Sequence, residues 1–308
     1  MEREELGVDH ELIERIKNLK RYHNAVILAH NYQRGEIQDI ADFVGDSLEL
    51  SQRAARTDAD VIVFCGVHFM AETAAILSPE KKVLLPDIEA GCPMADMITL
   101  EELKEAKKEF PDAVVVCYVN SSAQIKAESD VCCTSSNAVK VMRAYKGRRI
   151  IFVPDRYLGQ YVSEATGQEL ILWPGYCATH SWIGPEDIRK LKRQYPGVPV
   201  VVHPECRPEV RAMADAVLST GGICRFASEQ DFTSLIVGTE TGILHRLRKE
   251  NPSKRFIPAS RNAVCPNMKR TTLRKVARCL ERLEPEITVP QEIRRKAKKA
   301  LDAMLALT

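Results

Sequence analysis

The sequence predicts an α/β protein built from three similar units, each a small parallel sheet covered by helices. Three observations lead to this fold class. Short apolar runs read as buried strands, a pattern of strands and helices recurs with a nearly constant period, and each copy ends with a cysteine close to glycine or proline. Alternating strands and helices are typical of parallel sheets with helices on their faces.

Each copy opens with a continuous Val/Ile-rich run that stops abruptly in polar residues. Such runs are expected of strands that are buried on both faces of a parallel sheet. The three runs are AVILAHNYQ (25–33), AVVVCYVNS (113–121) and VPVVVHPEC (198–206). Helical patterns such as LELSQRAAR (48–56) and NAVKVMRAYK (137–146) separate the later strand-like pieces.

Two landmarks measure the repeat independently. The opening runs start 88 residues apart (113 minus 25) and then 85 apart (198 minus 113). The closing cysteines, Cys92, Cys177 and Cys265, are 85 apart (177 minus 92) and then 88 apart (265 minus 177). This agreement indicates a genuine repeat. We therefore predict a first repeat with an N-terminal helix in residues 1–108, a second in 109–193, a third in 194–270, and closing helices in 271–308.

Composition and charge exclude several classes of protein. Of 308 residues, 45% are hydrophobic and 28% charged, and the net charge of +2 gives no support for a nucleic-acid or membrane-surface partner. No run approaches the roughly 18 apolar residues of a membrane span. The charged N-terminus lacks the apolar region of a secretory signal, so we expect a cytoplasmic protein. In a reducing compartment, the ten cysteines predict metal ligation, catalysis or core packing rather than disulfides.

Amphipathic helices are predicted at both ends of the chain. Residues 271–283 and 290–306 are the closing helices, and residues 9–22 form the first helix. The apolar face of that first helix consists of Leu12, Ile13, Ile16 and Leu19. The basic run at 294–299 reads as a solvated helix face rather than a nucleic-acid site, because the net charge is close to neutral.

The repeated cysteines are candidate metal ligands. Ligands gather at the C-terminal ends of the strands in parallel α/β sheets. If a pseudo-three-fold axis relates the units, Cys92, Cys177 and Cys265 meet in one central cavity. Three thiolates suit an iron–sulfur cluster or a zinc ion, and a cluster held by only three leaves one iron open to a substrate. Each cysteine alone reads as a buried loop residue, but recurrence in all three copies favours ligation.

Polar residues near the strand ends are candidate substrate-binding and proton-transfer groups. Ser47, Ser135 and Thr220 recur just before helices, where a hydroxyl either caps the helix or adds to an anion site at its exposed N–H groups. Imidazole, phenol and carboxylate groups at the ends of the opening runs can transfer protons. The polar residues at these ends are His30, Tyr32, Tyr118, Asn120, His203 and Glu205. His180 follows Cys177 by three residues and is expected near the same metal.

With these residues the sequence resembles the quinolinate synthases, enzymes of de novo NAD synthesis. The resemblance covers essentially the whole chain, and its many ordered blocks make it highly specific. The blocks are LAHNYQ, ADFVGDSLELS, FCGVHFMAETA, LPDIEAGCPMAD, VCYVNSSA, CTSSNA, PDRYLG, WPGYCATH, VHPEC and STGG. Some members carry further cysteines in a CxxCxxC arrangement near the last ligand. Here PNMKRTT follows Cys265, which predicts a short form without redox regulation through that motif.

The resemblance implies three αβα sandwich domains with pseudo-three-fold symmetry around a central active site, and a 4Fe–4S cluster held by Cys92, Cys177 and Cys265. It implies that two small anionic substrates, iminosuccinate (iminoaspartate) and dihydroxyacetone phosphate, condense to quinolinate, phosphate and water. It also implies a functional link to an aspartate-oxidising enzyme. The implied substrate-binding residues are His30, Ser47, Tyr118, Val119, Asn120, Ser135, His203, Pro204, Glu205 and Thr220.

The chemical types at the strand ends lead to a catalytic hypothesis. We expect Tyr32, His203 and Glu205 to share proton transfer, and an open iron to act as a Lewis acid. Two alternatives remain open: a different cluster-dependent dehydratase on the same fold, and a zinc-stabilised protein that binds small anions without catalysis. An electron carrier is disfavoured, because three ligands beside acid–base groups suit substrate binding better than electron transfer alone.

Overall fold

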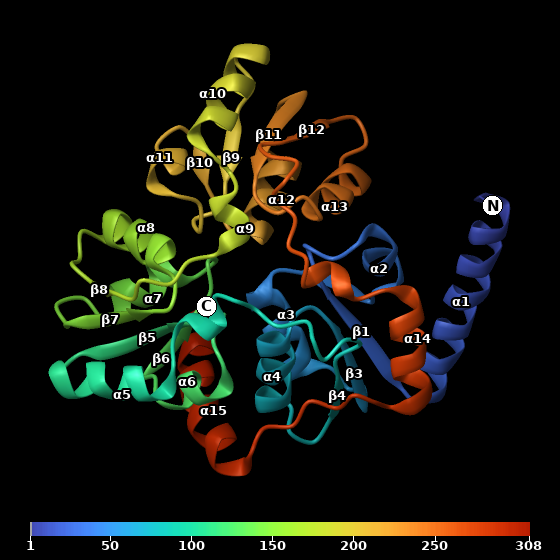
Figure 1. Cartoon of the computed structure of the whole chain (residues 1–308), viewed down its shortest axis with the longest axis horizontal. Helices are drawn as coiled ribbons and strands as arrows, with labels where there is room; N and C mark the ends of the chain where they lie inside the picture. Colours follow the sequence, from blue (N-terminus) through green and yellow to red (C-terminus); the bar gives the residue numbers. More distant parts are fainter. Residues whose placement is uncertain (1) are drawn as a thin grey trace. The chain divides into compact units, whose positions relative to one another are not determined.

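The computed structural model describes residues 2–308, and the side chains of residues 10–308 (Figure 1). The chain forms two compact units. Unit 1 comprises Met1–Cys92 with Pro266–Pro290, and unit 2 comprises Pro93–Cys265 with Gln291–Thr308. The two closing helices therefore belong to different units, and the four-part division of the chain stays a prediction. Among residues 2–308, no helix combines the length and apolar character that crossing a membrane requires.

Each repeat contains a four-stranded, fully parallel sheet with the same strand order. The orders are β2-β1-β3-β4, β6-β5-β7-β8 and β10-β9-β11-β12. The strands are β1 Ala25–His30, β2 Phe43–Gly45, β3 Val61–Cys65, β4 Lys82–Leu84, β5 Val114–Tyr118, β6 Val131–Cys133, β7 Ile150–Val153, β8 Ile171–Leu172, β9 Val200–Val202, β10 Ala216–Val217, β11 Ser234–Gly238 and β12 Arg255–Pro258. The predicted class, α/β with three similar units, is confirmed, whereas the symmetric arrangement around a centre stays a prediction.

An aspartate at the same place in all three sheets shows how closely the copies agree. It directly precedes the edge strand that pairs with the first strand of its repeat, and its carboxylate accepts the N–H group of the residue fifteen positions earlier. The carbonyl of that earlier residue accepts the aspartate N–H in return. These two bonds fix the register of the edge strand. The pairs are Asp42 with Ile27 (2.8 Å), Asp130 with Val115 (2.7 Å) and Asp215 with Val200 (2.7 Å).

Helices cover both faces of the sheet in unit 1. One face packs against α1 (Glu2–Tyr22), α2 (Gly35–Ile40) and α14 (Leu273–Arg282), and α1 and α14 lie side by side (Figure 1). The helices α3 (Ser47–Arg56) and α4 (His68–Leu77) pack on each other. They also pack against β1 and β4. The predicted apolar face of the first helix is confirmed. Ile16 is buried in the hydrophobic core that α1, α2 and α14 form with the sheet, and Leu12, Ile13 and Leu19 pack against that core. The helix begins earlier than predicted, at Glu2.

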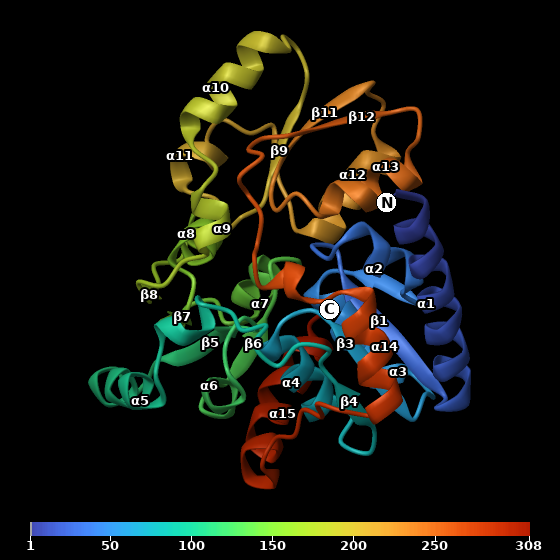
Figure 2. The same ribbon diagram turned by 45° about the vertical axis from the view of Figure 1, so that its right-hand side comes forward.

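Unit 2 contains the second and third sheets with their helices. The helices are α5 Leu100–Glu109, α6 Ala123–Ala127, α7 Ala138–Ala144, α8 Arg156–Thr166, α9 Ala178–Ser181, α10 Pro185–Gln194, α11 Pro208–Arg211, α12 Thr220–Glu229, α13 Ile243–Glu250 and α15 Gln291–Ala306. Short 3-10 turns lie at Ala95–Met97 and, in unit 1, at Met268–Arg270. The last helix, α15, packs on α6 and β6 through its buried stripe of Ala297, Ala300, Leu301 and Met304 (Figure 2). Its basic run is largely exposed, as expected of a solvated face.

Candidate active site

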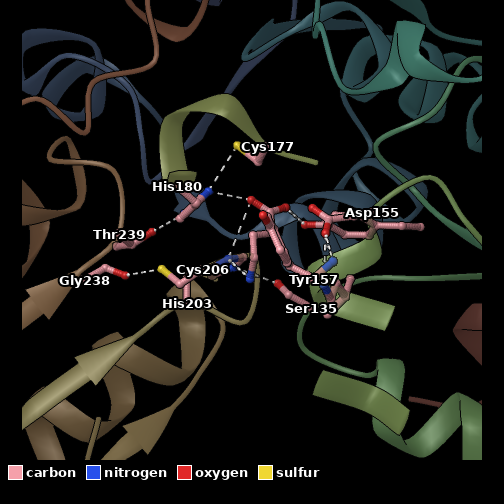
Figure 3. A network of polar contacts seen from close by, with 12 residues as sticks. Ser135, Asp155, Tyr157, Cys177, His180, His203, Cys206, Gly238 and Thr239 are labelled. Carbon is pink, nitrogen blue, oxygen red and sulfur yellow. Dashed lines mark hydrogen bonds and ion pairs between the residues drawn. The ribbon is translucent and has the colours of Figure 1, made fainter. Parts of the chain in front are cut away.

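Polar residues of the second and third repeats meet in unit 2, at the carboxyl ends of β5 and β9. Tyr118 ends β5, and His203 and Glu205 follow β9. The Tyr118 hydroxyl donates a hydrogen bond to Glu205 Oε1 over 2.6 Å. His203 Nε2 lies 3.1 Å from Ser135 Oγ (Figure 3). All of these except the half-buried Ser135 are buried. Residues 87 and 68 positions apart in the sequence thus form one polar network.

The parallel sheets explain why these side chains meet. In each parallel sheet, the residues that follow the strands gather at the carboxyl edge, and the contacts of Tyr118 with Glu205 and of Ser135 with His203 join the carboxyl edges of the second and third sheets. Backbone hydrogen bonds hold the residues that directly follow β5 and β9 against neighbouring strands. The Val119 N–H donates to the Cys133 carbonyl and the His203 N–H to the Gly238 carbonyl, each over 2.9 Å.

His180 connects this network to one of the repeated cysteines. The helix α9 begins directly after Cys177, which places His180 one turn further on. Its Nδ1 atom lies 3.2 Å from Cys177 Sγ (Figure 3). The same atom lies 2.7 Å from a Glu205 carboxylate oxygen. Its Nε2 atom lies 2.8 Å from Thr239 Oγ1, a partner that the sequence did not reveal. Its ring also stacks on that of His203, with 4.7 Å between centroids.

This cluster contains donor atoms of the types that bind metals. Cys177 Sγ, a ring nitrogen of His180 and a carboxylate oxygen of Glu205 all lie within 4.8 Å of one another. Thiolate, imidazole and carboxylate ligands are found together at transition-metal sites. Unit 2 therefore contains a group of side chains that could bind a metal ion.

Two buried carboxyl groups in this network have opposite pKa shifts. Burial raises the pKa of Glu205, but interactions with His180 and His203 and the Tyr118 hydrogen bond outweigh it and lower the pKa to about 2. Burial, reinforced by the charge of Glu205, raises the pKa of Asp155 well above its ordinary value. Carboxyl groups with separated pKa values in one site can take different roles in proton transfer. Asp155 is not among the site residues predicted from the sequence. It could have been found in the same way as Glu205, because both are acidic residues that lie just after a buried strand.

Asp155 is also held by the backbone. Its Oδ1 atom caps α8 by accepting the N–H groups of Tyr157 (2.8 Å) and Leu158 (2.9 Å). Its Oδ2 atom is buried and has no hydrogen-bond partner within residues 2–308. Asn120 Oδ1 is likewise buried without a hydrogen-bond partner among the described residues. Val119 and Pro204 are buried next to the network residues, and neither has a polar side chain.

The ten cysteines, all within the described part of the chain, separate by exposure. Cys92, Cys177 and Cys265 are partly exposed, and the other seven are buried. Burial raises the pKa of the Cys279 thiol to about 12, and it also raises the pKa of Cys206, so these thiols stay protonated. The cysteines that recur in the sequence are thus the ones that solvent and ligands can reach.

Cys177 and Cys265 are also linked through a short series of contacts in unit 2. His180, which contacts Cys177, also contacts Thr239. The next residue, Glu240, accepts the N–H group of Cys265 through its Oε1 atom over 3.0 Å. Both cysteines therefore belong to the neighbourhood of the same polar network.

Unit 1 carries predicted site residues at the carboxyl edge of its own sheet. His30 ends β1, and both it and Tyr32 are buried. The Tyr32 N–H donates to His30 Nδ1 over 3.2 Å, and the two rings meet edge to face with 4.6 Å between centroids. Ser47 begins α3, and Cys92 ends the loop that follows β4. The substrate, catalytic and ligand roles of these residues stay predictions.

Neighbouring residues, rather than the predicted hydroxyl residues, cap two of the helices. Asp46 caps α3 through the N–H groups of Leu48 and Glu49, and Ser219 caps α12 through that of Gly222. The capping alternative for Ser47 and Thr220 is therefore wrong, because both are the first residues of their helices. The Ser136 hydroxyl donates to that of Ser219 over 2.7 Å, which brings the starts of α7 and α12 together.

The chain is similar to known proteins over nearly its whole length. Residues 14–306 match the sequence model of the family described as NadA, quinolinate synthetase A protein. A quinolinate synthase of Dehalococcoides mccartyi (strain ATCC BAA-2266 / KCTC 15142 / 195) is 61% identical over 294 residues, covering 96% of this chain and 97% of the relative. The quinolinate synthase of Desulforudis audaxviator is 56% identical over 303 residues (98% and 100%), and quinolinate synthase 2 of Methanosarcina acetivorans is 55% identical over 300 residues (97% of each). The chain therefore belongs to the quinolinate synthase (NadA) family of enzymes.

Proposed function

We propose that this chain condenses iminosuccinate with dihydroxyacetone phosphate in the cytoplasm, releasing quinolinate, phosphate and two waters as a step of NAD synthesis. The main support for this proposal is the series of contacts from Tyr118 through Glu205 and His180 to Cys177, in a chain of the quinolinate synthase family. The proposed reaction forms bonds between the two substrates and expels oxygen-bearing groups. It involves no net oxidation or reduction, and it needs acid–base groups at several steps.

We further propose that Cys92, Cys177 and Cys265 hold a 4Fe–4S cluster. Thiolates are the usual cluster ligands, and the partial exposure of these three cysteines fits that role. When bound there, a cluster with one open iron would supply Lewis acidity toward a hydroxyl or carboxylate oxygen of a substrate. Since Cys265 is followed by PNMKRTT, the CxxCxxC type of redox regulation is not expected.

The protein's own side chains would move the protons. Glu205 is ionised, with 3% of its surface exposed, and it accepts the Tyr118 hydroxyl, so it is in the form that can take up a proton and is held beside a proton donor. His203, held near Ser135, can return protons to departing oxygen atoms. We include Tyr32 in the set because it follows the equivalent strand in unit 1. Burial of these groups keeps water from competing for their protons.

Ser135 and Thr220 are proposed to bind the carboxylate or phosphate groups of the substrates. Replacing either with alanine is expected to raise KM by about 10- to 100-fold, since a hydrogen bond to a charged group contributes about 1.5–3 kcal/mol. Steady-state kinetics with each substrate varied in turn measures the effect, and the iron content should not change. Ser228→Ala is the matched control, because this hydroxyl lies on α12 and bonds the Cys224 carbonyl. Equal KM values in the variants and the control would contradict the assignment.

Anaerobic reconstitution with iron and sulfide tests the proposed function. The loaded chain is expected to hold about four irons and four sulfides. It should form quinolinate when an aspartate-oxidising enzyme generates iminosuccinate beside dihydroxyacetone phosphate. A chain that loads the cluster but makes no quinolinate would favour a different dehydratase. A colourless chain with one zinc and no activity would favour an anion-binding protein, for which the Cys177, His180 and Glu205 group supplies suitable ligands.

A further inference from the structure

The loop that leads from β4 to Cys92 is a tight turn organised by Asp87. The Asp87 Oδ1 atom accepts the Glu89 N–H over 2.9 Å, and the Asp87 carbonyl accepts the Ala90 N–H over 3.1 Å. The Ala90 carbonyl in turn accepts the His68 N–H at the start of α4, over 2.7 Å. The backbone just before Cys92 is thus fixed from within the loop and from α4.

The second carboxylate oxygen of Asp87 connects this loop to a distant part of the sequence. Asp87 Oδ2 accepts hydrogen bonds from Lys275 Nζ over 2.5 Å and from Arg270 Nε over 3.2 Å. Lys275 Nζ also donates to the Arg270 carbonyl over 2.9 Å. Asp87 is only 8% exposed, whereas the two cationic side chains are 43% and 40% exposed. One buried carboxylate therefore joins the loop of Cys92 to the chain that follows Cys265.

Residues 268–275, which we call the clasp, also contact the loop that follows β1. The Arg34 side chain donates from Nε to the Lys269 carbonyl over 2.8 Å, and Lys269 Nζ donates to the Tyr32 carbonyl. The Gln33 amide lies 3.6 Å from Met268 Sδ. The clasp thus contacts the loop that carries Tyr32 and the loop that leads to Cys92.

The helix α14 also packs on the sheet through apolar side chains. That helix already buries Leu273, Val276, Ala277 and Leu280 against the sheet. Burying a carboxylate is costly unless it is paired, and here two cations pair with it. Burial raises the pKa of Asp87, but the hydrogen bond and charge of Lys275, together with Arg270, lower it overall, so the group is ionised. The ion pairs fix the position of Asp87, and Asp87 in turn fixes the backbone of the turn before Cys92.

We propose that Asp87 is a positioning residue that, through Lys275 and Arg270, pre-organises Cys92 to bind the metal–sulfur cluster. This inference rests on the proposed function and goes beyond it, because it assigns a role to residues that bind neither substrate nor metal. Partners that orient metal ligands typically change metal affinity by about 10- to 100-fold when they are replaced.

The test uses the full-length chain with Asp87→Asn. Asparagine keeps an acceptor for the Glu89 N–H but removes the charge that pairs with Lys275 and Arg270. After anaerobic reconstitution, iron release to a chelator is expected to be about 10- to 100-fold faster than in the wild type. The thermal unfolding midpoint of the metal-free chain reports any general loss of stability. Lys275→Met removes the cation that lies closest to the Asp87 carboxylate. If Asp87→Asn does not fold, the iron-release rate of this variant tests the same proposal.

Glu286→Gln is the matched control. It breaks the Lys82–Glu286 ion pair (3.0 Å) beside β4 in the same unit, without touching the turn. This variant is expected to release iron at the wild-type rate, and Asp87→Glu should restore part of the retention. If the folded Asp87 and Lys275 variants retain iron as the wild type does, the positioning role is refuted. A wild-type chain that binds no iron would instead refute the cluster proposal on which this role rests.

Discussion

Replacing Glu205 with glutamine is expected to lower kcat by about 10²- to 10⁴-fold, the range typical of general acid–base residues. Glutamine has nearly the same shape and still accepts the Tyr118 hydroxyl, but it carries no charge and cannot take up a proton. The effect should appear in kcat more than in KM. Steady-state quinolinate formation by the reconstituted chain measures it, and metal analysis confirms that the variant is loaded.

A matched control separates this effect from a general loss of charge. Glu164→Gln removes a carboxylate that pairs with Arg211 over 3.1 Å but is 62% exposed, so its kcat is expected to stay close to wild type. Combining Glu205→Gln with Tyr118→Phe should cost less than the two single changes together, because the two side chains share one hydrogen bond. Wild-type turnover in Glu205→Gln would remove Glu205 from the proton-transfer set.

Alanine at Cys92, Cys177 or Cys265 is expected to reduce the iron content from about four per chain to near zero, because each change removes a thiolate from a cluster held by only three. Activity should disappear with the cluster. Anaerobic reconstitution, followed by iron and sulfide analysis and by the visible absorption of the cluster, measures the loss for each variant separately.

Cys279→Ala is the matched control for the three ligand variants. Its thiol is 1% exposed and protonated, so this change should cost some stability but leave the iron content unchanged. Equal iron content in the Cys279 variant and in any one of the three others would exclude that cysteine from the ligand set. Loss of iron in all four would point to unfolding rather than ligation, which the thermal unfolding midpoint distinguishes.

The strands could be predicted from the sequence because their pattern is local. Apolar runs such as Val114–Tyr118 are long enough to identify buried strands, and the aspartates at 42, 130 and 215 recur at fixed positions before the edge strands. The start of the first helix was missed, because propensity within residues 2–8 gives no sharp boundary signal. Helix ends are set by a few competing hydrogen bonds, and sequence patterns define them poorly.

The partners of the candidate site residues were harder to predict. The sequence pointed to His180 because it lies near Cys177, but gave no sign of its contacts with Glu205 and Thr239. It left capping and anion binding open for Ser47 and Thr220, and Asp46 and Ser219 are the residues that cap these helices. A shift of one residue along a helix start decides which side chain accepts the N–H groups of the first turn.

By itself, the sequence determined the repeated α/β plan, the family, and the three cysteines that recur at one position of each copy. These features are carried by residue types at fixed spacings, so they are present before the chain folds. Only the tertiary structure decided that Tyr118 bonds Glu205, 87 residues away, and that Asp87 bonds Lys275, 188 residues away. Contacts between residues so far apart in the sequence depend on the path of the loops. Burial and the neighbouring charges then decide which carboxyl groups are ionised.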